Sequence, residues 1–161
     1  MRASTQSRPP SKKPLPLEDE VFVRLLRTAD ALLRDVEQVL KPAGLSHAQY
    51  NVLRILRGAG PEGLACREIG CRMITRDPDI TRLVDRLEAR GLVSRERERA
   101  DRRVVRTRIT AEGLRTLREL DEPISALHRR QLRHVPASRL RLLARLLEQS
   151  CERRGPEAGT A

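Results

Sequence analysis

The spacing of hydrophobic residues changes halfway along the segment 80–110, from the period of a helix to that of strands. The first half has the i, i+3, i+4, i+7 spacing of a helix with one buried face, at Ile80, Leu83, Val84 and Leu87. Gly91 follows as a helix-ending glycine. The segments 92–93 and 104–109 are rich in β-branched residues and flank the polar stretch 95–103. They predict a two-stranded hairpin joined by a polar loop.

The predicted hairpin and its flanks are rich in arginine. Between Arg72 and Arg108 the chain has twelve arginines and seven acidic residues, a balance of +5, whereas the helix 77–90 is close to neutral. The excess charge therefore falls where DNA phosphates would be met. A helix followed by such a hairpin is typical of a winged helix-turn-helix, which can place the helix in the major groove and the hairpin tip in the minor groove. The alternative is an amphipathic helix on a small hairpin whose arginines are only solvated.

Three helices are expected before this unit. Apolar residues along one side predict a long helix over 18–41, ended by a proline and a glycine. Ser46 and Gln49 match a capping box, which predicts the start of a second helix that runs to the glycines at 58 and 60. A short third helix is expected over 64–73. Asp77, which is followed by a proline, is expected to cap the fourth helix.

Two more helices are expected after the hairpin. Thr110 is expected to cap the first of them, and Pro123 should kink or interrupt it. Val135 and Pro136 separate it from a last, leucine-rich helix. The long apolar-faced helices at the two ends of the chain exceed what the small central core can cover. We therefore expect a second copy of the chain to cover them.

Composition narrows the class of partner. The chain has 161 residues and a net charge of +11, which favours a polyanion such as DNA, RNA or an anionic membrane surface. Aromatic residues are nearly absent, which argues against a single-strand binder that stacks bases on aromatic rings. The sequence has no apolar run long enough to span a bilayer and no leader-like start, so we expect a soluble cytoplasmic protein.

These features together resemble the MarR family of bacterial transcription regulators. The residues that carry the resemblance are Leu45 to Tyr50, Ile80 to Glu88, Gly91 to Val93, and Asp101 to Gly113. The resemblance implies a mainly α fold with a small β-hairpin, a winged helix-turn-helix flanked by N- and C-terminal dimerisation helices. It also implies a homodimer that represses by binding a pseudo-palindromic DNA operator and is released by a small molecule or an oxidant.

This resemblance divides the chain into segments. Residues 1–17 are expected to be a disordered tail and 154–161 a frayed C-terminus. The domain between them, 18–153, would consist of dimerisation helices over 18–44 and 111–153 and a DNA-binding winged helix-turn-helix over 45–110.

The resemblance also assigns DNA-binding residues. In the wing, Arg103 would enter the minor groove, with Asp101 orienting its guanidinium and Arg102 beside it. On the recognition helix the candidates are Arg76, Asp79, Thr81, Arg82 and Arg86. Of these, Thr81 and Arg82 match family positions that read base edges, and arginine typically pairs with guanine. An aspartate at 79 departs from the family pattern; it could accept from a cytosine amino group or cap the helix.

Other candidate chemistry is sparse. An effector cleft between the dimerisation helices and the winged unit would have Phe22, His47 and Tyr50 as its distinctive residues. The cysteines at 66, 71 and 151 lack metal-ligand spacing, so we expect no metal and no cofactor. The sequence has no phosphate-cradling glycine loop, nucleophile elbow or paired-carboxylate constellation, so we expect no enzymatic activity. Two alternatives stay open. One is a redox-responsive regulator that uses Cys66 or Cys71, and the other is a winged-helix scaffold for protein contacts without specific DNA binding.

Overall fold

The computed structural model describes residues 15–75, 79–97 and 104–152, with six α-helices and three short strands in this part of the chain. The helices are α1 (Leu17–Leu40), α2 (His47–Ala59), α3 (Cys66–Arg72), α4 (Ile80–Ala89), α5 (Ala111–Leu132) and α6 (Ala137–Glu152). The strands are β1 (Leu64–Ala65), β2 (Val93–Arg97) and β3 (Val105–Ile109). Two 3₁₀ turns, η1 (Lys41–Ala43) and η2 (Gly60–Glu62), follow α1 and α2.

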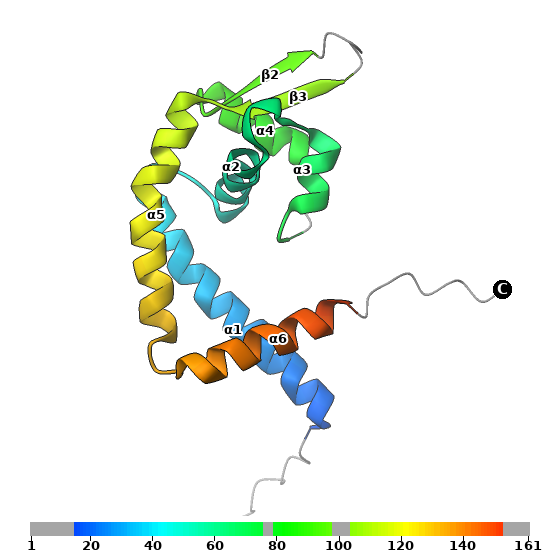
Figure 1. Ribbon diagram of the computed structural model, residues 1–161, viewed down its shortest axis with the longest axis vertical. Helices are drawn as coiled ribbons and strands as arrows, with labels where there is room; N and C mark the ends of the chain where they lie inside the picture. The colour runs from blue at the N-terminus through cyan, green and yellow to red at the C-terminus, as the bar shows by residue number, and fades with distance from the viewer. Residues whose placement is uncertain (1–14, 76–78, 98–103, 153–161) are drawn as a thin grey trace, which may run out of the picture.

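The elements form two regions joined by long helices. Helices α2, α3 and α4 and the sheet form a winged unit, while α1 and α5 run away from it and α6 leaves the far end of α5 at an angle (Figure 1). Helices α1 and α5 pack against each other. The prediction of a mainly α fold with a winged helix-turn-helix is therefore confirmed.

Helices α2 and α5 start, and α4 ends, where the sequence predicts. Ser46 and Gln49 form the reciprocal capping box at the start of α2. The hydroxyl of Thr110 accepts from the Gly113 backbone N–H at 3.1 Å and caps α5. Gly91 has the positive φ of 68° that a helix-ending glycine adopts, and the chain then enters β2.

The buried core lies between the winged unit and the adjoining halves of α1 and α5. Its largest fully buried side chains are Leu40, Leu53, Leu56, Ile69, Leu87, Leu117 and Leu127. On α1 only Val36 and Leu40 are buried, both near its C-terminal end. No apolar residue in the first half of α1 or in the described part of α6 is buried, and most of them are exposed.

The sheet has three strands, so the predicted two-stranded hairpin is incomplete. Strand β1 pairs with β3 through Leu64 and Thr107, giving the antiparallel order β1-β3-β2. The expected helix over 64–73 therefore begins only at Cys66. Strand β2 also extends to Arg97, three residues into the stretch 95–103 expected to be a loop. Pairing with β3, which includes an ion pair between Glu96 and Arg108, supports this extension.

The expectation that Pro123 interrupts its helix is wrong. Helix α5 is continuous through Pro123. Proline removes one N–H donor, but Glu119, whose carbonyl would have accepted it, is exposed and can be solvated. Leu120 and Ile124, on either side of the proline, are buried and hold both halves of the helix against the core.

A close approach at Gly113 sets the junction between the wing and α5. A Cβ atom at this position would lie 2.2 Å from the carbonyl oxygen of Leu92 and 2.8 Å from Cγ1 of Ile109. The obstructing carbonyl belongs to the backbone and cannot move aside as a flexible side chain could. Glycine therefore allows α5 to begin directly against the strands.

We expect Gly113→Ala to lower the free energy of unfolding by about 1–3 kcal/mol or more, the range for an overpacked core. Chemical denaturation measures the change. The matched control is Gly58→Ala on α2, where an added Cβ would meet nothing within 4 Å. That variant should be neutral or stabilised by about 0.5–1 kcal/mol, because alanine favours a helix interior. Equal stability of the two variants would contradict the close approach at 113.

Candidate nucleic-acid interface

Helix α4 presents one apolar face to the core and one polar face to solvent. Leu83, Val84 and Leu87 are buried. The outward residues Thr81 and Arg82 in the first turn, and Arg86 one turn later, are all exposed. The three described α4 residues that the sequence assigns to DNA therefore share the free face of one helix. Thr81 and Arg82 lie in its first turn, the end whose residues contact base edges in helix-turn-helix proteins.

Asp79 begins this helix and contacts one of its arginines. Its Oδ1 accepts from the backbone N–H of Arg82 at 3.1 Å, which makes Asp79 the N-cap. Its Oδ2 lies 3.0 Å from Nε of Arg82. The described helix begins at Ile80, so the expected start at Asp77 is wrong. Residues 76–78 themselves, including the candidate Arg76, lie outside the described residues.

Several arginines of the wing are held in ion pairs. Arg95 donates from its backbone N–H and its Nε to Glu88 on α4, at 3.1 and 2.8 Å, and its Nη1 lies 2.7 Å from Asp85. These contacts clamp β2 to the recognition helix. The hydrogen bond from Arg95 holds the pKa of the Glu88 carboxyl below its ordinary value.

Arginines of β3 are also held by polar contacts within the winged unit. Nε of Arg108 donates to the carbonyl oxygen of Pro61 at 2.7 Å, and its Nη1 pairs with Glu96. Arg106 pairs with Glu68 of α3 at 3.6 Å. Arg97, at the end of β2, is exposed. The local charge excess seen in the sequence thus divides into arginines that fasten the wing and arginines that face solvent.

Asp101, Arg102 and Arg103 lie outside the described residues, as does the rest of the segment 98–103. Their assignment to the minor groove stays a prediction.

A cleft of about 270 Å³ lies between the winged unit and the long helices. It is lined by Leu32, Leu33, Val36, His47, Tyr50, Asn51, Arg54, Ile74, Thr75, Ile124, His128, Gln131 and Leu132. Two of the three residues predicted for an effector cleft, His47 and Tyr50, are therefore among its walls. Phe22 lies outside it, exposed on the first half of α1. The sequence signal for this cleft was weak, because its walls come from helices far apart in the chain.

The polar groups of the cleft are few and well defined. The guanidinium of Arg54 lies 5.9 Å from the centre of the Tyr50 ring. Burial lowers the pKa of His47, an effect partly opposed by the nearby charge of Glu37. Oδ1 of Asn51 accepts from the backbone N–H of Ile74 at 2.9 Å. Because Ile74 precedes the segment that leads into α4, this bond joins the cleft wall to the approach to the recognition helix.

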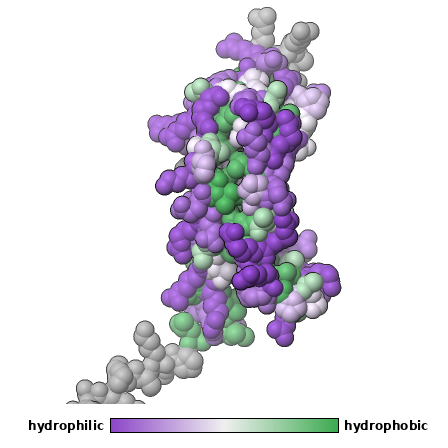
Figure 2. Space-filling model, turned by 90° about the vertical axis from the view of Figure 1, so that its left-hand side faces the viewer, coloured by the Kyte–Doolittle hydropathy of each residue, from purple (hydrophilic) through white to green (hydrophobic). Residues whose placement is uncertain are grey.

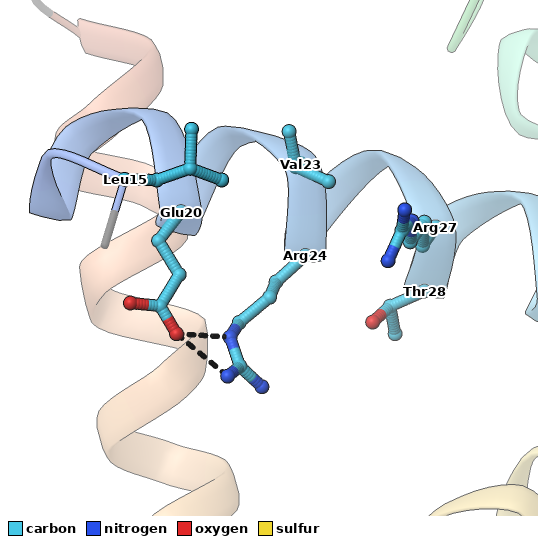
Figure 3. Close-up of a pocket in the computed structure, with 6 residues that line it drawn as sticks. All are labelled: Leu15, Glu20, Val23, Arg24, Arg27 and Thr28. Atoms are coloured by element: carbon cyan, nitrogen blue, oxygen red, sulfur yellow. Dashed lines mark hydrogen bonds and ion pairs between the residues drawn. The ribbon is translucent and has the colours of Figure 1, made fainter. Parts of the chain in front are cut away.

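A second hollow, of about 660 Å³, lies along the start of α1. Figure 3 shows that its lining comes from α1 and from Leu15 just before it, and that Glu20 pairs with Arg24 on this side of the helix. Within the described chain no second element contributes to its walls. It is a surface trough beside the exposed apolar residues of α1.

The cysteines that the sequence raised as redox candidates do not pair. Cys66 at the start of α3 is half-buried and Cys71 near its end is exposed, both as free thiols. Among the described residues, no helix is long and apolar enough to cross a bilayer. Nor does this part of the chain bring three His, Cys, Asp or Glu side chains together to hold a metal ion.

Comparison with known proteins identifies the family. The model of the MarR family matches residues 45–105, which span α2 to the start of β3. The chain is 30% identical over 131 residues to the HTH-type transcriptional repressor IacR of Pseudomonas putida, covering 81% of this chain and 77% of that protein. The chain therefore belongs to the MarR family and is a transcription regulator with a winged-helix DNA-binding fold.

Solved structures agree with this assignment. A MarR transcription factor from Planctomyces limnophilus is 43% identical, with a TM-score of 0.65, over 85% of this chain and 99% of that one. The structure of CouR from Rhodococcus jostii RHA1 bound to p-coumaroyl-CoA is 29% identical, with a TM-score of 0.73, over 89% of this chain and all of that one. The family consists of transcription regulators and not enzymes, as the sequence predicts.

The division of wing arginines can be tested with two residues of β2. We expect Arg95→Ala to lower the free energy of unfolding by about 1 kcal/mol, because it removes the clamp to α4. Arg97→Ala should change stability by less than about 0.5 kcal/mol. It should instead weaken binding to duplex DNA and reduce the log-log salt slope by about one per wing. Denaturant melts and fluorescence anisotropy at several salt concentrations measure both quantities. A loss of stability in Arg97→Ala but not in Arg95→Ala would contradict the assignment of Arg95 as the structural arginine and Arg97 as the DNA-facing one.

Proposed function

We propose that this regulator is a repressor that binds a pseudo-palindromic operator as a homodimer and is released from it by a small molecule. The observation that carries the proposal is the exposed face of α4, which presents Thr81, Arg82 and Arg86 beside a basic wing. Arginine provides bidentate contacts to guanine in the major groove. The relative IacR, which carries the word repressor in its name, supports the direction of regulation.

The homodimer is supported by apolar surface that one copy leaves uncovered. On α1 the exposed apolar residues include Leu17, Val21, Phe22, Leu25 and Leu26, and on α6 they are Leu142, Leu143, Leu146 and Leu147. Hydrophobic groups gather at the end of the molecule where α1 begins (Figure 2). Soluble monomers rarely expose contiguous apolar patches of this kind. A two-fold pair would cover α1 and α6 and present two recognition helices.

Release by a small molecule is supported by the cleft and its connection to α4. Aliphatic walls next to the guanidinium of Arg54 suit an amphipathic anion such as an aryl carboxylate. The complex of CouR with p-coumaroyl-CoA shows that a related protein binds a ligand with an aromatic acyl group. A ligand between α1, α2 and α5 would touch Asn51 and Ile74, and through them would bias the position of α4.

Selection of bound sequences from random duplex DNA tests the proposal. We expect one enriched motif with inverted half-sites whose centres lie about one helical turn apart, because each copy would read one half-site. Binding should have a steep salt slope, with 6–10 phosphates neutralised and roughly 10³–10⁵ of affinity lost between 50 and 200 mM salt. Equal affinity for the selected and for random duplexes would identify a protein that binds duplex DNA without sequence preference. A slope near zero would favour the scaffold alternative.

Light scattering of the free protein provides the companion measurement. At micromolar concentrations we expect twice the 18.3 kDa mass of one chain. Leu143→Glu places a charge on the exposed apolar face of α6 and should shift the mass towards the monomer. A wild-type protein that stays at 18.3 kDa would remove the basis for an inverted repeat.

The effector step is tested with p-coumarate and related aryl carboxylates as probes on the protein–duplex complex. If such a probe releases the DNA, Arg54→Gln should raise the concentration needed by about tenfold or more, because a charge-assisted hydrogen bond is lost. Arg118→Gln, an exposed position on α5 outside the cleft, should leave that concentration unchanged. Failure of every aryl carboxylate to bind or to release DNA would rule out this ligand class.

A further inference from the structure

The start of α4 carries an acidic residue on the surface proposed to face DNA. A carboxylate near phosphates is repelled, so an aspartate at position 79 weakens DNA binding unless the residue has another role there. The sequence leaves two purposes open: contact with a cytosine amino group, and capping of the helix. The contacts of Asp79 favour a third, which combines the cap with the control of one arginine.

The two oxygens of Asp79 have different partners on the same residue. Oδ1 accepts from the backbone N–H of Arg82 at 3.1 Å, and Oδ2 lies 3.0 Å from Nε of its guanidinium. The cap thereby sets the position of the carboxylate relative to the helix, and the ion pair places the guanidinium of Arg82 beside the carboxylate. Contact at Nε leaves the edge formed by the two terminal amino groups, which can donate in parallel to two acceptors.

Helix stability alone does not account for an aspartate here. Serine, threonine and asparagine serve as N-caps about as well and carry no charge. The side chains of Asp79 and Arg82 are 44% and 76% exposed, and ion pairs between such exposed groups contribute little to stability. The consequence specific to a carboxylate is therefore directional, because it limits the orientations of a long side chain that would otherwise lose much freedom on binding.

We propose that Asp79 is a positioning residue that holds Arg82 for paired hydrogen bonds to O6 and N7 of a guanine in each half-site. The inference rests on the proposed DNA-binding function. It makes Asp79 a determinant of base discrimination that acts through Arg82 and touches no base itself. Pre-orientation of the guanidinium would raise the preference for guanine, since a fixed fork matches the two acceptors of that base better than a mobile one.

The test uses the full chain and the duplex selected from random DNA, with each base pair of the half-site replaced in turn. The measured quantity is the ratio of affinities for the selected and the replaced duplex. Arg82→Ala should lower this ratio by about tenfold or more at one guanine. Asp79→Asn should lower it at the same guanine, by about threefold or more, while its melting temperature stays near that of wild type because asparagine still caps the helix. The double variant should discriminate no worse than Arg82→Ala.

Asp85→Asn is the matched control. It removes the same charge from the same helix, but Asp85 pairs with Arg95 of the wing and not with Arg82. Both Asn variants should bind all duplexes more tightly, and only Asp79→Asn should change the ratio at the guanine. Unchanged discrimination in Asp79→Asn overturns the proposal, and a change at a different base pair overturns it in favour of a direct contact. If wild-type protein enriches no sequence at all, the proposed function itself fails.

Discussion

The recognition helix, the wing and helix α5 are held together at one junction around Thr110. Its backbone N–H donates to the carbonyl of Leu92 at 3.1 Å, and its hydroxyl donates to the carbonyl of Gly91 at 2.7 Å while accepting from Gly113. The end of α4, the start of β2, the end of β3 and the start of α5 all meet here. The absence of a side chain at Gly113 makes this contact possible, because the Leu92 carbonyl occupies the space of a Cβ. A shift of α5 would therefore be transmitted to the wing.

Ion pairs with acidic residues reduce the number of wing arginines whose charge is available to DNA. The sequence shows many arginines around the wing, but the acidic residues among them are distributed so that particular arginines become structural. Glu88 and Asp85 hold Arg95, and Glu96 holds Arg108. An arginine in such a pair contributes less free charge to a DNA phosphate, and it stiffens the element that carries other arginines. The acidic residues of this region therefore hold the shape of the surface that we propose faces DNA, as well as reducing its net charge.

The cleft contacts both the long helices and the residues that precede α4, so a ligand in it could act on both. Its walls come from α1, α2 and α5, and it reaches the segment that leads to α4 through Ile74, whose side chain is 72% exposed. Gln131 of α5 donates to the Leu32 carbonyl and to Asp35, which ties α5 to α1 at the same level. A ligand lodged there would press on both the long helices and the approach to α4. The two regions of the molecule would then respond together.

The sequence by itself determined those features whose partners are near in the chain. The capping box of Ser46 and Gln49, the cap at Thr110 and the apolar face of α4 each depend on residues within one or two turns, so periodicity and spacing were enough to predict them. The family followed from the same local patterns. Thr81, Arg82 and Arg86 could likewise be placed on one free helix face from spacing alone.

Only the tertiary structure decided the features whose partners are distant. Strand β1 exists because two residues beside Gly63 meet β3, and no local pattern separates such a strand from the first turn of a helix. Continuity of α5 at Pro123 depends on packing against the core, and the exclusion of Phe22 from the cleft depends on which half of α1 is buried. The division between clamped and exposed arginines has the same origin. In each case the free energy comes from contacts between segments far apart in the sequence, which composition and periodicity do not encode.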